Sequence, residues 1–413
     1  MRTPSFTPSE LEKLDSLANR ALAALLQRNL HRGTIVATPI LLVGATYPGT
    51  WLEHNQDTLF LADYAPENAW ATNEAFILRQ REDGLLPFCL PRDPSGYFKA
   101  DAVFWQVQSV YPFVRSAMTT AAAAGRPAED FRRIYEAGCR YDRWFRENRD
   151  RAGTGLVEMY CEFDTGHDNS PRVIDGGIPH SCPGNDARNM PDLPCMPLIA
   201  ADLSATRYGD RMALAELAGQ LGFHEEARQW RQDAEALRLK MRKLLYDAES
   251  DFYYDRSPEG LRKYRTEHIT RLFLNHVLDQ ADFNRIYDRH FRSPEEFDAP
   301  FPYPAISISD PSFVKECPVN CWGANCQANT AERALLWLQD YGLPDERRAL
   351  LGEWGRIFVE TDGDFGQEVN PFTRKVLPSG GLYSPALILC IEAARTFTGF
   401  EPSKAAREIR SQQ

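Results

Sequence analysis

The segment from Asp164 to Arg172 is the most informative part of this sequence. It reads Asp-Thr-Gly-His-Asp-Asn-Ser-Pro-Arg, so two acids, an amide, a hydroxyl and a guanidinium surround a glycine and a proline. An Asp among neutral polar partners can hold a proton at neutral pH when it is partly desolvated, as a general acid must. The same residue types are also typical of a solvated turn. Composition alone leaves both interpretations open.

A second acidic segment offers a partner for such an acid. Hydrolysis of a glycosidic bond requires a proton donor and a second carboxylate that activates water or attacks directly. Asp168 is the candidate donor, and Asp362, Asp364 and Glu368 are candidates for the second role. Aromatic residues suited to sugar stacking and polar residues suited to binding hydroxyls accompany them: Trp51, Trp105, Tyr303 and Trp322, and Asn55, Asp57, Gln106, Asn325 and Gln327. Each also has an ordinary structural interpretation, as a packing aromatic or a polar residue at a helix end.

Helical periodicity dominates the regular parts of the chain. Thr7-Pro8-Ser9-Glu10 predicts a helix start, with an N-cap residue, a proline in the first turn and a glutamate that completes a capping box. Apolar stripes predict further helices at 131–145, 193–221, 225–246, 330–341, 347–360 and 385–397. The apolar run 35–43 and the segment Phe252-Tyr253-Tyr254 are candidates for short strands.

Long loops rich in Gly, Pro, Asn, Asp and aromatic residues separate these helices. They cover residues 31–57, 80–103, 150–192, 293–329 and 361–384. Long loops are uncommon in compact domains unless they are functional. Their recurrence at one end of successive helices predicts an all-α toroid of antiparallel helix pairs with a loop-lined mouth. No linker or shift in composition divides the chain, so residues 1–413 are expected to form a single domain.

Bulk composition narrows the class of partner. The chain has 413 residues, 43% of them hydrophobic, and a net charge of −11, which disfavours nucleic acid and anionic membrane surfaces. The absence of an apolar leader or a long apolar run favours a cytoplasmic protein, as do nine cysteines, an odd number typical of reduced thiols. Cys317, Cys321 and Cys326 lack the spacing of a zinc site. Neither a metal nor another cofactor is expected, and the oligomeric state stays open.

The acid-bearing segment resembles a motif of glycoside hydrolase family 63 and the related family 37 trehalases, usually Glu-Ser-Gly-x-Asp-Asn-Ser-Pro in the former. Other segments follow in the family's order: Trp51 to Asp57, residues 80–87, Phe104-Trp105-Gln106, residues 230–260 and residues 319–342. The resemblance covers roughly residues 45–397. It implies an (α/α)6 barrel that hydrolyses glycosides with inversion, with Asp168 as general acid. The residues expected to bind substrate are Trp51, Asn55, Asp57, Trp105, Gln106, Asn169, Arg172, Trp322 and Gln327.

The sequence departs from the family at the second carboxylate. The family's base lies in Glu-x-Tyr-Asn-Pro, four residues before the proline, where this chain has Gln367. Glu368 lies three residues before Pro371 and is the predicted base, because a neutral amide cannot deprotonate water. Asp164 also replaces the family's usual Glu, and residues 320–325 match their motif poorly.

The resemblance implies a small carbohydrate as the substrate. Compact bacterial members of the group act on short α-glucosides or α-mannosides, including glucosylglycerate and mannosylglycerate, so such a substrate is expected here. Two alternatives stay open: a sugar epimerase on the same toroid, which would use histidines for proton transfer, and a non-catalytic sugar-binding barrel.

Overall fold

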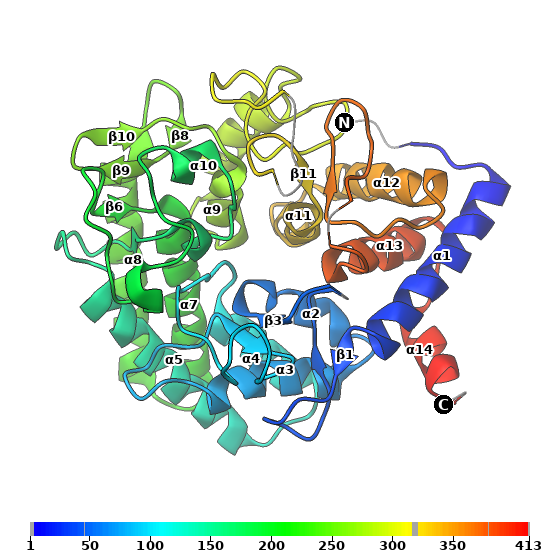
Figure 1. Cartoon of the computed structure of the whole chain (residues 1–413), viewed down its shortest axis with the longest axis horizontal. Coiled ribbons are helices and arrows are strands. Elements are labelled where there is room, and N and C mark those ends of the chain that lie inside the picture. Colours follow the sequence, from blue (N-terminus) through cyan, green and yellow to red (C-terminus); the bar gives the residue numbers. More distant parts are fainter. Residues whose placement is uncertain (1–3, 45, 316–320, 379, 412–413) are drawn as a thin grey trace.

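The computed structural model describes residues 4–44, 46–315, 321–378 and 380–411, and this part of the chain is mainly helical. Figure 1 shows the helices surrounding the middle of the molecule. The α-helices are α1 (Pro8–Gln27), α2 (Asp57–Leu61), α3 (Pro66–Leu78), α4 (Phe113–Ala123), α5 (Ala128–Asn148), α6 (Pro171–Ile174), α7 (Ala201–Gln220), α8 (His224–Leu245), α9 (Thr270–Leu274), α10 (Gln280–Ile286), α11 (Ala328–Asp340), α12 (Pro344–Glu360), α13 (Ser384–Phe397) and α14 (Pro402–Ser411).

Contacts between the helices run in a closed order. Helix α2 packs against α4, α4 against α7, α7 against α9, α9 against α11, α11 against α13, and α13 against α2. Helices α3, α5, α8, α12 and α1 each pack against members of this series. Helix α14 packs on α1, so the two terminal helices lie side by side (Figure 1).

The strands are short and belong to the connections between helices. They are β1 (Leu30–His31), β2 (Ile40–Leu41), β3 (Gly49–Trp51), β4 (Cys89–Pro91), β5 (Glu158–Met159), β6 (Leu198–Ile199), β7 (Tyr246–Asp247), β8 (Phe252–Tyr253), β9 (Asp255–Ser257), β10 (Gly260–Arg262), β11 (Cys326–Gln327) and β12 (Glu368–Val369). Strands β10, β9, β6 and β5 form one antiparallel sheet in that order. The other strands form antiparallel pairs, including β3 with β4 and β11 with β12.

The predicted helices are present, with two instructive differences. The capping box at the start of α1 is confirmed, because Thr7 and Glu10 each accept a hydrogen bond from the other's backbone N–H. The helix predicted from residue 193 begins only at Ala201, since Pro194 and Pro197 lack the N–H that a helix interior needs and 198–199 pair in the sheet. Helices α3 and α4 were not predicted. Helix α3 is buried on most sides, so it presents no clear apolar stripe, and the sequence of α4 consists largely of Ala, Ser and Thr, which give a weak apolar signal.

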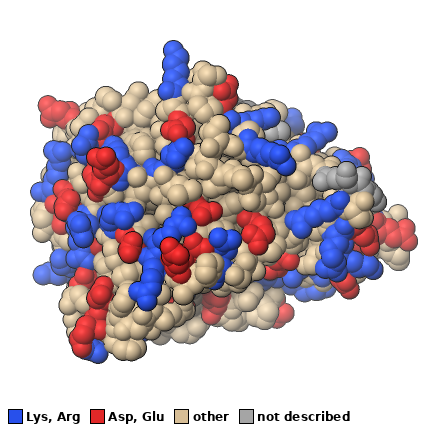
Figure 2. Space-filling model, turned by 90° about the horizontal axis from the view of Figure 1, so that it is seen from below, with Lys and Arg blue, Asp and Glu red and all other residues tan. Residues whose placement is uncertain are grey.

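Charged residues of both signs mix on the surface. On the face shown in Figure 2, Lys and Arg alternate with Asp and Glu without a large patch of one sign. Within the described residues, every helix is too short or too polar to cross a membrane.

Candidate active site

A pocket lies where the predicted long loops meet. It encloses about 220 Å³, and its wall takes residues from each predicted loop range and from residues 105–108. The prediction of a loop-lined mouth is therefore confirmed. The described lining residues are Val43, Tyr47, Trp51, Glu53, His54, Phe88, Tyr97, Phe98, Trp105, Gln106, Gln108, Phe163, Gly166, Asp168, Ser181, Trp322, Asn329, Gln367 and Tyr383.

The loop that carries Asp168 is anchored at its start by Asp164. The Asp164 side chain is fully buried and forms an ion pair with the guanidinium of Arg149. Its carboxylate also accepts hydrogen bonds from the backbone N–H groups of Val107, at 2.9 Å, and Tyr160, at 2.8 Å. A buried carboxylate with this many donors is a fixed structural element. Asp164 therefore holds the loop in place and leaves the pocket to Asp168.

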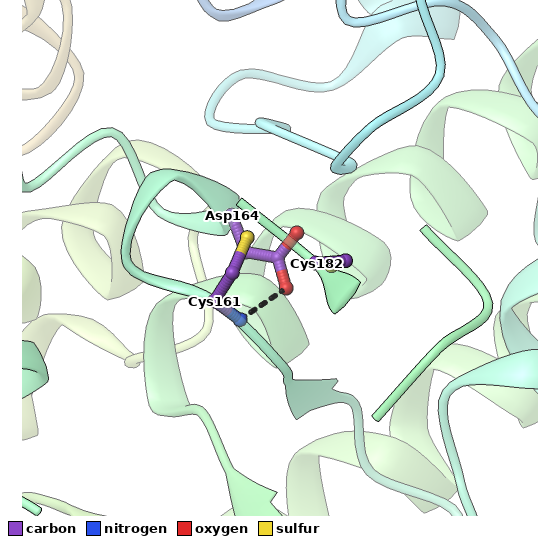
Figure 3. Close-up of side chains that lie close together, drawn as sticks. All are labelled: Cys161, Asp164 and Cys182. Carbon is purple, nitrogen blue, oxygen red and sulfur yellow. Dashed lines mark hydrogen bonds between the residues drawn. The ribbon is translucent and has the colours of Figure 1, made fainter. Parts of the chain in front are cut away.

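Asp164 also lies between two thiols. Cys161, Asp164 and Cys182 place their ligand atoms within 4.8 Å of one another, and Figure 3 shows the three side chains together. A metal ion here would compete with Arg149, which also donates to the Cys182 sulfur at 3.5 Å. The positive charge next to these three side chains is therefore that of the Arg149 guanidinium. The three cysteines that the sequence analysis set aside as a zinc site are different ones: Cys321 and Cys326 are buried elsewhere, and Cys317 lies outside the described residues.

Gly166 brings the acid loop against a second carboxylate. It has φ +70°, and a Cβ at this position would lie 2.5 Å from Oε2 of Glu53. A glycine is therefore required for two reasons, the left-handed backbone and the contact with Glu53. Glu53 and Asp168 are the carboxylates among the described lining residues, and Gly166, two positions before Asp168, lies against Glu53.

Comparing alanine substitutions at Gly166 and Gly153 separates the cost of the left-handed backbone from the cost of the contact with Glu53. Gly153 has φ +64° and open space within 4 Å of the point that a Cβ would occupy, so Gly153→Ala measures the backbone cost alone. We expect that cost to be about 1–2 kcal/mol of unfolding free energy. Gly166→Ala should cost about 1–3 kcal/mol more, because the methyl group displaces Glu53. Urea unfolding of both variants gives the comparison, and equal losses would contradict the close approach of Glu53.

Glu53 is held as an ionised carboxylate. It accepts hydrogen bonds from Gln108 at 2.5 Å and Asn329 at 3.3 Å, and its Oε1 lies 3.4 Å from the Arg333 guanidinium and 3.8 Å from His54 Nε2. Burial alone would raise the pKa of Glu53. The neighbouring His54 and Arg333 side chains, together with the hydrogen bond from Gln108, lower the pKa of Glu53 below its ordinary value despite this burial. An ionised carboxylate is the form that accepts a proton from water.

The segment predicted to supply the base divides between the pocket wall and the interior. Gln367 lines the pocket and accepts a hydrogen bond from the Tyr47 hydroxyl at 2.5 Å. Glu368 has an exposed fraction of 0% and is not among the lining residues. Its Oε2 accepts hydrogen bonds from Asn325 at 2.7 Å and from the backbone of Cys321 at 3.0 Å. Its role as base stays a prediction from sequence.

Tyr47 locates all three acids near one point. Burial raises the pKa of the Tyr47 hydroxyl, and the charges of Asp168, Glu53 and Glu368 raise it further. Such an effect falls off with distance, so the charges of all three carboxylates are felt at this hydroxyl. These acids come from three separate segments of the chain, and the outer two, Glu53 and Glu368, lie more than 300 positions apart.

Arg172, a predicted sugar-binding residue, lies beneath the pocket. Its guanidinium donates two hydrogen bonds of 2.7 Å to Asp202 and two more, of 2.5 and 3.0 Å, to Asp255. It also contacts Nδ1 of His167 at 2.8 Å, and the His167 ring packs 4.8 Å from that of Trp322. Arg172 therefore supports a lining aromatic, and its own contact with substrate stays a prediction.

Some of the residues predicted from the sequence line the pocket, and the others lie outside its lining. Those on the pocket wall are Trp51, Trp105, Gln106, Asp168 and Trp322. Those outside the lining are Asn55, Asp57, Asn169, Arg172, Gln327 and Glu368, of which Asn169 is exposed and the others are buried. Lining residues that the sequence did not single out include Tyr47, Glu53, His54, Tyr97, Phe98, Gln108 and Tyr383. Their common signal is aromatic and polar content in the predicted loops and in residues 105–108.

An aromatic pocket with two carboxylates on its wall offers the groups that hydrolysis of a glycosidic bond requires. The family described as the mannosylglycerate hydrolase MGH1-like glycoside hydrolase domain matches residues 56–351, more than half of the chain. The chain belongs to this family.

Individual relatives are distant. The chain is 26% identical over 185 residues to mannosylglycerate hydrolase MGH1 of Selaginella moellendorffii, covering 41% of this chain and 35% of the relative. It is 28% identical over 142 residues to MGH2 of the same organism, covering 30% and 28%. These matches therefore span about a third of the length of the curated relatives.

Solved structures share the fold over nearly the whole chain. The GH63 mannosylglycerate hydrolase from Thermus thermophilus in complex with Tris has a TM-score of 0.71 at 18% identity, covering 91% of this chain and 99% of that one. Neutral trehalase Nth1 from Saccharomyces cerevisiae has a TM-score of 0.61 at 13% identity, covering 95% and 81%. At these identities the likeness concerns the fold.

Proposed function

We propose that this protein is an inverting glycoside hydrolase that cleaves a short α-linked glucoside or mannoside. The proposal also takes the closed series of helix contacts as the (α/α)6 toroid of a single domain. The observation that carries it is the pair of carboxylates, Asp168 and Glu53, on the wall of one aromatic pocket. Family membership supports the same reaction class.

In this proposal Asp168 is the proton donor. Its proton goes to the glycosidic oxygen as the bond from that oxygen to the anomeric carbon breaks, and the bonding electrons leave with the aglycone. A water on the opposite face of the sugar forms the new bond and gives its proton to a second carboxylate. Inversion follows, because attack and departure occur on opposite faces.

We assign the second role to Glu53, which is ionised and stands on the pocket wall. Glu368 remains the alternative that the sequence predicts, and it would have to act from behind the wall. Trp51, Trp105, Gln106 and Trp322 would orient the sugar by stacking and hydrogen bonding.

The product anomer tests the proposed reaction. Incubation with a panel of α-glucosides and α-mannosides, followed by NMR, should show release of a β-anomer that then mutarotates. Release of an α-anomer would establish retention and contradict the inverting mechanism. Binding of sugars without turnover across the panel would favour the non-catalytic alternative.

A further inference from the structure

Helix α11 presents two side chains to the Glu53 carboxylate. Asn329 lies in the first turn of α11 and Arg333 one turn later, so both stand on the same face of the helix. The Asn329 side chain donates a hydrogen bond of 3.3 Å to Oε1 of Glu53, and the Arg333 guanidinium lies 3.4 Å from the same oxygen. Asn329 belongs to the described pocket lining, and Arg333 does not. Asn329 therefore borders both the proposed base and the space for a ligand.

The charge of Glu53 fixes the orientation of the Asn329 amide. An amide has a donor end and an acceptor end, and only the NH2 end is attracted to an ionised carboxylate. The reverse orientation would place the amide oxygen against a carboxylate oxygen. The NH2 group is thus directed to Glu53, and the amide oxygen, Oδ1, is the end left for another partner.

Oδ1 of Asn329 is a buried acceptor at the edge of the pocket. Asn329 is 1% exposed, and its Oδ1 accepts no hydrogen bond from any described residue. Buried amide oxygens are nearly always hydrogen-bonded, either within the protein or to ordered water. Because Asn329 lines the pocket, the donor that Oδ1 requires is one that the pocket can supply, either water or a hydroxyl of the ligand.

One water molecule can span Asn329 and Glu53. The oxygen and nitrogen of an amide lie about 2.3 Å apart, and the nitrogen of Asn329 lies 3.3 Å from Oε1 of Glu53. Oδ1 and Oε1 are therefore at most about 5.6 Å apart, the reach of two hydrogen bonds of about 2.8 Å from one water. Oε1 has capacity for such a bond, since its contacts with Asn329 and Arg333 are long and the 2.5 Å bond from Gln108 falls on Oε2.

We propose that Asn329 is a further catalytic residue, which holds the attacking water together with Glu53. The water donates one O–H to Oε1 of Glu53 and the other to Oδ1 of Asn329, so its lone pairs point away from both acceptors and toward the sugar. As the new bond to the anomeric carbon forms and the bond to the leaving oxygen breaks, the first proton passes to Glu53 and the second stays on the product hydroxyl. This role rests on the proposed hydrolase function, in which Glu53 is the base.

Asn329→Ala tests this role by its kinetic signature. We expect kcat to fall by about 10- to 100-fold with KM nearly unchanged, because the water is misplaced while the sugar keeps its contacts. The fall should be equal on a disaccharide and on a glycosyl fluoride, since water attack is common to both substrates. Gln106→Ala, which removes a lining amide proposed to orient the sugar, should mainly raise KM. An unchanged kcat in Asn329→Ala, or a rise in KM alone, would overturn the proposal.

Asn275→Ala controls for the loss of a buried amide. Asn275 is 3% exposed, its Oδ1 likewise accepts no hydrogen bond from a described residue, and its side chain donates to the backbone oxygen of Arg271 at 2.7 Å. It lies outside the described lining of the pocket that contains Glu53. Both variants should lower the unfolding midpoint by a similar amount, and only Asn329→Ala should lower kcat. A comparable fall of kcat in Asn275→Ala would attribute the effect to lost stability and contradict the role in holding water.

A crystal structure of the ligand-free wild-type protein separates this role from the hydrolase function. We expect an ordered water within hydrogen-bonding distance of both Oδ1 of Asn329 and Oε1 of Glu53. Such a water in a protein that hydrolyses none of the glycosides tested would support the water site and count against the hydrolase function. A protein group bonded to Oδ1, or two oxygens without a shared water, would overturn the proposal even if the protein is active.

Discussion

Asp168→Asn is expected to reduce kcat for α-glycosides with alkyl or sugar leaving groups by about 10²–10⁴-fold. The amide cannot donate an acidic proton to the departing oxygen, so the leaving group must depart as an alkoxide. Because the asparagine side chain has nearly the same size, KM should change little. Steady-state kinetics on a disaccharide and on a glycosyl fluoride provide the measurement.

The fluoride is the informative control. Fluoride departs with much less need for protonation, so Asp168→Asn should retain far more of its activity on the glycosyl fluoride than on the disaccharide. Asp192→Asn, which removes an exposed carboxylate outside the pocket lining, should behave like the wild type on both. Equal losses on the two substrates would show that Asp168 acts in some way other than proton donation.

Glu53→Gln is expected to lower kcat by about 10²–10⁴-fold, because the neutral amide cannot take the proton from water. The Gln side chain still offers an oxygen to Gln108 and Asn329, but the ion pair with Arg333 is lost. The unfolding midpoint must therefore be measured beside the rate. Glu53→Ala opens space on the wall, where azide should restore activity and yield a β-glycosyl azide from an α-substrate.

Glu368→Gln is the matched comparison. Its amide oxygen can still accept from Asn325 and Cys321, so we expect activity within about tenfold of the wild type. Azide should have no effect on this variant. Loss of activity in Glu368→Gln together with an active Glu53→Gln would reverse the assignment and establish the base that the sequence predicts.

The sequence singles out the proposed acid, Asp168, but not Glu53, the carboxylate that shares its pocket wall. Asp168 lies in a continuous segment whose residue types and order match a family motif, so local information is sufficient. Glu53 lies 115 positions earlier and carries no comparable signal beside Trp51. Its importance depends on contact with Gly166 and on Arg333, which are remote in the chain. The path of the backbone through residues 367 and 368 places Gln367 on the pocket wall and buries Glu368 behind it.

The sequence by itself determined the helices with a clear apolar stripe, such as α1, α5 and α8, and the loops that build the pocket wall, because both follow from local periodicity and turn-forming residues. It did not reveal α3, whose burial on most sides removes the stripe, or α4, whose many small residues leave the stripe weak. Only the tertiary structure shows which acids share the pocket wall and that Arg172 forms ion pairs with Asp202 and Asp255. It also shows that the described pocket lining contains no Lys or Arg. Charge pairing and burial depend on contacts between remote segments. Local sequence patterns do not show which of these remote segments will be in contact.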